Sequence, residues 1–131
     1  MSDRLKYVLG VQIFYVVLCV VWNLVGDYQR QLGLPSIGPT ASVMMAMVMA
    51  CLCIAQFFSA KHQWKMTYLS LSILFAVGAM SAIYGAFTKE LSLWPSAFWR
   101  WAGVVVNLIG VLSMSLVAVY WARIWSPATS D

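Results

Sequence analysis

Polar side chains that could do chemistry are few in this chain, and four of them are amides inside long apolar stretches. These amides are Gln12, Asn23, Gln56 and Asn107. Burying an amide in hydrocarbon without a partner costs roughly 2–7 kcal/mol, so each one should face other protein groups. Gln12 and Asn23 also share a helix face with Cys19. The amides therefore predict a polar seam between helices, used either for interhelical hydrogen bonds or for binding a small uncharged solute or a lipid headgroup.

Groups suited to acid–base catalysis, nucleophilic attack or metal binding are scarce. The single histidine, His62, lies in a short polar turn, and Asp27 and Glu90 are the only acids away from the two chain ends. Cys51 and Cys53 are two residues apart, so on a helix they point to nearly opposite faces and cannot bind one metal together. We expect no catalytic residue, no metal and no cofactor. An outer-surface lipid-modifying enzyme that uses Asp27 and Glu90 is kept as a second alternative.

Small residues form another pattern, with the spacing i, i+4, i+7 in the third and fourth apolar stretches. The two sets are Gly78, Ala82 and Gly85, and Gly103, Asn107 and Gly110. Small residues let membrane helices approach closely. In an antiparallel hairpin Gly78 would approach Gly110, and Asn107 would bond to Ser81 or to a backbone carbonyl. We therefore expect both sets to form helix-packing contacts rather than a ligand site.

The apolar stretches that carry these residues cover residues 7–25, 40–60, 66–87 and 99–124. About 20 helical residues cross a hydrocarbon core of about 30 Å, so each stretch is long enough to span a membrane. The chain is 63% hydrophobic and only 9% charged, which is too little charge for a water-facing surface. We predict an all-α integral membrane four-helix bundle with up-down topology, forming a single transmembrane domain over residues 1–131.

The basic residues predict the orientation of the bundle. The first stretch lacks a small-x-small cleavage pattern after it, so we expect a retained helix rather than a signal peptide. If the amino terminus is cytoplasmic, that side holds five Lys and Arg residues and the far side holds three. The five are Arg4, Lys6, Lys61, Lys65 and Arg123, and the three are Arg30, Lys89 and Arg100. The excess predicts both termini in the cytoplasm, with the bundle in a bacterial inner or plasma membrane.

The fourth stretch carries aromatic and basic residues at both ends. They are Trp99, Arg100 and Trp101 at one end and Trp121, Arg123 and Trp125 at the other. Between the two arginines lie 22 residues, about 33 Å of helix, which matches the hydrocarbon thickness. Indole rings prefer the headgroup level and arginine side chains extend toward it. We therefore expect these six residues to be interface anchors.

Scarce chemistry and abundant packing signals favour a structural or interaction subunit, or a modulator, of a membrane complex. Its partners would be the lipid bilayer and either a second copy or a larger membrane protein; nucleic acid is not expected, because the basic residues lie singly at helix ends. The alternative is a small homo-oligomeric carrier or channel lined by the four amides. A proton-coupled carrier needs an acid or a histidine inside the membrane. The four apolar stretches contain neither.

Overall fold

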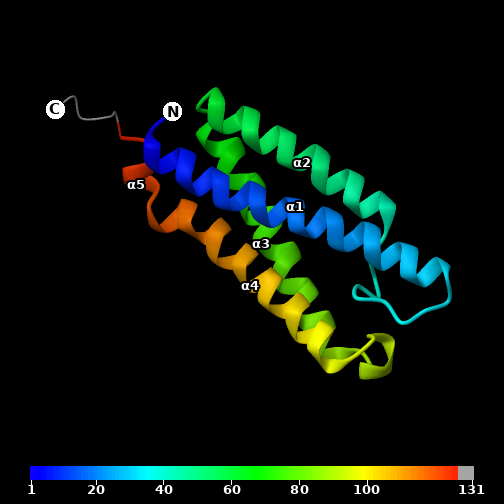
Figure 1. Ribbon diagram of the computed structural model, residues 1–131. Helices are drawn as coiled ribbons and strands as arrows, with labels where there is room; N and C mark the ends of the chain where they lie inside the picture. The colour runs from blue at the N-terminus through cyan, green and yellow to red at the C-terminus, as the bar shows by residue number, and fades with distance from the viewer. Residues whose placement is uncertain (127–131) are drawn as a thin grey trace.

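The computed structural model describes residues 1–126; the predicted domain also includes residues 127–131, which lie outside the described part. Four long helices account for most of the described chain (Figure 1). They are α1 (Asp3–Gln31), α2 (Val43–Lys61), α3 (Lys65–Thr88) and α4 (Ala97–Val119), with a short 3-10 helix η1 (Leu91–Leu93) and a short α5 (Trp121–Ile124). All four long helices are long and apolar enough to cross a membrane. The predicted all-helical architecture with four such helices is confirmed.

The long helices pack in a ring in which α1 contacts α2 and α4, and α3 contacts the same two helices. At one end, which we call the terminal end, the amino terminus lies beside α5 and the α2–α3 turn (Figure 1). There the Ser2 hydroxyl donates to the Ile124 carbonyl at 2.7 Å. At the opposite loop end, residues 32–42 meet residues 89–96, and Ser36 N–H donates to the Leu93 carbonyl at 3.1 Å.

Serine caps begin two of the helices. The hydroxyl of Ser2 accepts from Leu5 N–H at 3.1 Å, and that of Ser42 accepts from Met45 N–H at 3.0 Å. Each hydroxyl satisfies a backbone N–H that has no partner within its own helix. In the turn between α2 and α3, Gln63 has a positive φ of 57°. The turn is too short to separate the two helices, and they contact each other.

Helix α1 is longer than the stretch predicted for it, which ends at residue 25. The helix continues to Gln31. Gly26 is buried, and a Cβ there would lie 2.9 Å from the Cβ of Ala41 and 3.0 Å from Oγ of Ser36. The connection therefore folds back against the last turns of α1, and this close contact requires a glycine at position 26.

The fourth predicted stretch is one continuous segment, but the structure divides it at Tyr120. Helix α4 ends at Val119 and α5 begins at Trp121. The connection before α4 lies against the bundle, as Trp94 is only 7% exposed and packs with Ala86 and Val104. The division at Tyr120 falls at a helix end, where boundaries are the least regular part of a helix.

Candidate functional site

Two of the four predicted amides meet at the centre of the bundle. Gln12 on α1 and Gln56 on α2 are both fully buried. The Gln56 amide donates from Nε2 to Oε1 of Gln12 at 3.1 Å. The contact replaces water for two groups that cannot remain unpaired in an apolar interior.

Two residues of α3 complete this contact, and sequence reasoning missed both. The Tyr68 hydroxyl donates to Gln12 Oε1, and Gln56 Nε2 donates to Oγ of Ser72 at 3.1 Å. Tyr68 is 0% exposed and Ser72 is 1% exposed. We call Gln12, Gln56, Tyr68 and Ser72 the glutamine cluster. One signal in the sequence points to Tyr68: Gln56 and Tyr68 lie at similar distances along their helices from the α2–α3 turn.

A backbone carbonyl on α4 fixes the direction of the hydrogen bonds in the glutamine cluster. Gln12 donates from Nε2 to the Ser113 carbonyl at 3.2 Å. A carbonyl only accepts, so the nitrogen of Gln12 must face α4 and its oxygen must face Gln56. All four long helices are thereby joined by side chains or backbone groups around Gln12. One buried acceptor, Gln56 Oε1, has no hydrogen-bond partner among the described residues.

Asn107 on α4 belongs to a different contact. Its Oδ1 accepts from the Tyr15 hydroxyl at 3.2 Å, and its Nδ2 donates to the Gly103 carbonyl at 2.8 Å. The partner expected from the sequence, Ser81, is exposed on α3. The prediction that Asn107 bonds across to α3 is therefore corrected: its side-chain partner is on α1.

Asn23 lies at the loop end and connects α1 to the start of α2. Its Oδ1 accepts from Ser42 N–H at 3.2 Å, while its Nδ2 donates to the Cys19 carbonyl at 2.9 Å and lies 3.9 Å from the sulfur of Met49. Ser42 is the N-cap residue of α2. The four amides thus belong to three separate hydrogen-bonded groups and not to one continuous seam. Helix α1 contributes one residue to each group: Gln12, Tyr15 and Asn23.

The glycines of α4 face α1. A Cβ on Gly110 would lie 2.3 Å from Cζ of Tyr15, so the ring occupies the space that any side chain would need. At Gly103 the nearest such atom is Cζ2 of Trp22, at 3.6 Å. Both residues permit close packing, as the sequence predicts, but against aromatic rings of α1 rather than against α3.

The predicted packing residues of α3 do not line the interior of the bundle. Gly78 and Ala82 are exposed and Gly85 is half-buried. A Cβ added at Gly78 or Gly85 would meet no atom within 4 Å. Helix α3 instead turns Ser72, Phe75, Ala79 and other residues inward. The expected approach of Gly78 to Gly110 is therefore absent, because the face of α3 that meets α4 is a different one.

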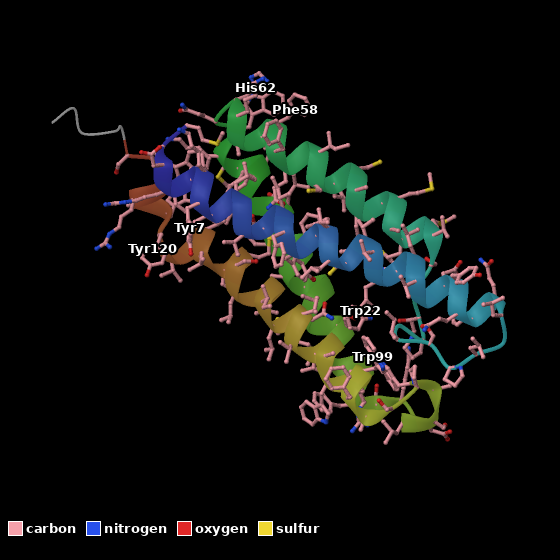
Figure 2. The ribbon with its side chains drawn as sticks, viewed as in Figure 1. Tyr7, Trp22, Phe58, His62, Trp99 and Tyr120 are labelled. Atoms are coloured by element: carbon pink, nitrogen blue, oxygen red, sulfur yellow. The ribbon has the colours of Figure 1, made fainter. Side chains whose placement is uncertain are left out.

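The six predicted anchors lie near the two ends of the bundle. Trp99 packs at the loop end against Trp22 of α1, with ring centroids 6.0 Å apart (Figure 2). At the terminal end the ring of Trp125 lies 5.8 Å from that of Tyr68. The other four are exposed or half-buried. They are Arg100, Trp101, Trp121 and Arg123.

The loop end is held by backbone-directed contacts that the sequence did not reveal. Ser36, 1% exposed, donates to the Gly26 carbonyl at 2.7 Å. The indole of Trp22 donates to the Ile37 carbonyl at 2.9 Å, and Gln29 accepts from Ile37 N–H at 2.8 Å. These partners are adjacent only after the connection folds back, so spacing along the chain carries no signal for them.

The two loop acids have local partners. Asp27 accepts from Arg30 at 2.8 Å and from Gln31 at 2.6 Å, and Glu90 lies 3.5 Å from the Ser92 hydroxyl. Among the described residues, the structure contains no group of three or more His, Cys, Asp or Glu side chains placed to hold a metal ion.

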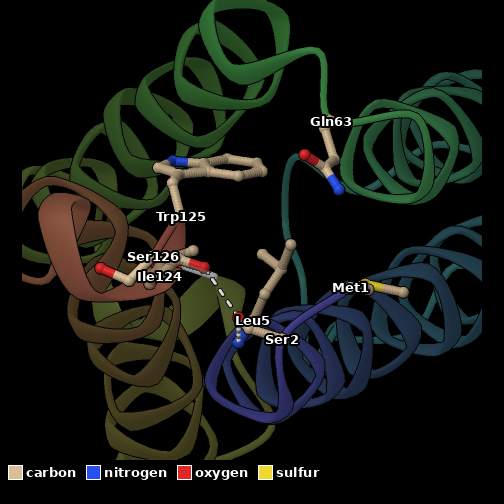
Figure 3. Close-up of a pocket in the computed structure, with 7 residues that line it drawn as sticks. All are labelled: Met1, Ser2, Leu5, Gln63, Ile124, Trp125 and Ser126. Carbon is tan, nitrogen blue, oxygen red and sulfur yellow. Dashed lines mark hydrogen bonds between the residues drawn. The ribbon is translucent and has the colours of Figure 1, made fainter. Parts of the chain in front are cut away.

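A hollow of about 300 Å³ opens at the terminal end (Figure 3). Gln63 of the α2–α3 turn and Trp125 lie on facing sides of it, with Leu5 below them in the view. The hydroxyl of Ser2 is already bonded to the Ile124 carbonyl. The hollow therefore combines one available amide with walls that are partly polar and partly apolar, and no titratable side chain lines it.

The chain matches no protein-family model, no curated protein and no solved structure.

Proposed function

We propose that this chain is a small polytopic membrane protein with up-down topology that acts as a structural or interaction subunit, or a modulator, of a membrane complex, without catalysis of its own. The observation that carries the proposal is the outward face of α3. Gly78, Ser81 and Ala82 lie together on this exposed face, and no other part of the described chain covers it. We call these three residues the α3 outer face.

The composition of the α3 outer face suits a second helix better than lipid. Small residues let two backbones approach closely, and a serine can hydrogen-bond across such a contact. Within the bundle the same role is played by Gly110, which receives the ring of Tyr15. Gly78 has the same chemistry and no such neighbour, so a helix from outside the chain is its natural partner.

The alternative of a carrier or channel lined by the four amides loses its main support. Gln12 and Gln56 are fully buried and bonded to each other within one chain. Asn23 and Asn107 bond to groups elsewhere. A path for a solute would require these contacts to open, and each opening would leave buried polar groups unpaired.

The proposed location is a bacterial inner or plasma membrane with the terminal end in the cytoplasm. The support is the distribution of basic residues over the two ends of the bundle. The terminal end carries Arg4, Lys6, Lys61, Lys65 and Arg123, and the loop end carries Arg30, Lys89 and Arg100. The carboxyl terminus lies outside the described residues, so the proposal for it follows from the position of α5.

Cysteine crosslinking in native membranes tests the proposal. In a chain whose three native cysteines are replaced by alanine, Ser81→Cys is compared with Val105→Cys, an exposed position on α4. The first partner to test is a second copy, because one small-residue face can pack against itself about a two-fold axis. We expect a crosslinked dimer from Ser81→Cys and none from Val105→Cys.

Three results of this experiment are informative. Adding Gly78→Leu should abolish the crosslink, since a large side chain separates the helices. An adduct of another mass would identify a different membrane protein as the partner and retain the proposed role. Equal crosslinking at Ser81 and Val105 would indicate random collision and would contradict the proposal.

A further inference from the structure

A groove of about 620 Å³ lies at the terminal end, between the start of α1 and the junction of α4 with α5. Its walls are contributed by opposite ends of the sequence. Arg4, Tyr7 and Val8 come from α1, and Leu116, Tyr120 and Arg123 come from the other side. Figure 2 places Tyr7 and Tyr120 close to this end of the bundle.

The break between α4 and α5 creates the groove. Tyr120 leaves the helical conformation, with φ −104° and ψ 20°, and the chain then turns into α5. The Ser2 hydroxyl holds the Ile124 carbonyl at 2.7 Å and thereby fixes α5 against α1. Arg123 is consequently brought to the same groove as Arg4, although 118 positions separate them in the sequence.

The charge of the groove is positive. Asp3 also lines it, but the carboxylate of Asp3 is paired with Lys6 at 3.1 Å. Neither Arg4 nor Arg123 forms a salt bridge with another described residue. The guanidinium of Arg123 lies 5.9 Å from the ring centre of Tyr120. Two arginines are thus available to an anion, and the nearest acid already has a partner.

The polar and apolar parts of the groove are arranged as those of a phospholipid are. Val8 is buried and Leu116 is half-buried, and both lie one to two helical turns deeper in the bundle than the arginines. Tyr7 and Tyr120, 72% and 42% exposed, place phenol groups between these levels. Guanidinium groups bind phosphate through paired hydrogen bonds, and tyrosines favour the boundary between headgroups and hydrocarbon.

We infer that this groove binds an anionic phospholipid, with its phosphate between Arg4 and Arg123 and an acyl chain along Val8 and Leu116. The inference depends on placement in a membrane and is independent of the α3 outer face. It adds a ligand class, a glycerophospholipid with net negative charge, to a chain proposed above to act through helix packing.

Native mass spectrometry of the purified full chain in mild detergent, with equal amounts of phosphatidylglycerol and phosphatidylcholine, tests the inference. The wild type should retain phosphatidylglycerol in preference. Arg4→Gln combined with Arg123→Gln should lower that preference roughly ten-fold or more, and each single change about five-fold. The matched control is Lys61→Gln combined with Lys65→Gln, which removes two positive charges at the same end outside the groove and should leave the preference unchanged.

The inference is overturned if the wild type shows no preference for the anionic lipid. It is also overturned if the lysine control loses as much preference as the arginine variant, since bulk surface charge would then explain the binding. A further arm adds inorganic phosphate alone. If phosphate stabilised the protein as much as phosphatidylglycerol does, the site would be assigned to a free anion instead. If the double arginine variant does not fold, the single variants decide, and an unchanged preference in a folded single variant overturns the inference.

Discussion

Helices α3 and α4 carry small residues with the same spacing, yet the structure uses them in opposite ways. On α4, Gly110 is buried beneath the ring of Tyr15, and a Cβ there would lie 2.3 Å from Cζ of that ring. On α3, Gly78 is exposed and a Cβ would meet nothing within 4 Å. One glycine is required by the fold of the chain, and the other is exposed on the face where we propose that a partner helix packs.

The difference shows what a small-residue pattern says about a membrane helix. Small residues indicate that something approaches the helix closely, but they do not say whether it belongs to the same chain. In water, an apolar face must turn inward, which settles the question. In lipid an apolar face is stable on either side, so the direction is decided by specific contacts such as the one between Tyr15 and Gly110.

Gly110→Ala should have the largest effect on stability. The added Cβ would overlap the Tyr15 ring, and forcing an extra group into a packed site costs about 3 kcal/mol. Unfolding of the detergent-solubilised protein by titration with sodium dodecyl sulfate measures the loss. Combining the change with Tyr15→Ala should cost less than the sum of the two single changes, because the ring that the added Cβ overlaps is then absent. Wild-type stability of Gly110→Ala would mean that α1 and α4 are not in this contact.

Gln12→Leu should rank second. The change leaves the Tyr68 hydroxyl and the Ser113 carbonyl without Gln12 as partner, at a cost of about 2 kcal/mol. The same unfolding titration applies. Gln12→Leu combined with Gln56→Leu should cost less than the sum of the two single changes, because each removes a group that the other leaves unpaired. Strict additivity would show that the two glutamines do not interact.

Tyr15→Phe should have a small effect. It deletes only the hydroxyl that donates to Asn107 Oδ1 at 3.2 Å and keeps the ring against Gly110. Hydrogen bonds between membrane helices contribute about 0.6 kcal/mol on average. A double-mutant cycle with Asn107→Ala in the same titration should give a coupling energy of that size, and a coupling near zero would separate the two side chains.

Gly78→Ala should have the smallest effect on folding, within about 0.5 kcal/mol. The position is exposed and open, so the added methyl group meets no other residue of the chain. Gly10→Ala, equally open on α1, is the matched control. The comparison of α3 with α4 would fail if Gly78→Ala destabilised the chain as strongly as Gly110→Ala does.

Sequence reasoning reached the helices more reliably than the contacts between them. Apolar length located four helices, including the stretch at 66–87 that became α3 at Lys65–Thr88. It also indicated that Gln12 and Gln56 need protein partners. It did not supply Tyr68 or Ser72 as those partners: Tyr68 lies at a matching distance from the α2–α3 turn, but only packing decides that this face of α3 turns inward. The partner of Asn107 was assigned to α3 because the small residues of α3 and α4 have matching spacing, whereas its side-chain partner is Tyr15 on α1.

The sequence by itself determined that four long apolar helices form, because the lengths and composition of the stretches leave no other way to satisfy the backbone in an apolar environment. Only the tertiary structure decided which face of each helix turns inward. The helices are apolar almost all round, so burial gives no rule for their rotation, and a few polar and steric contacts around Gln12, Tyr15 and Gly110 set it instead.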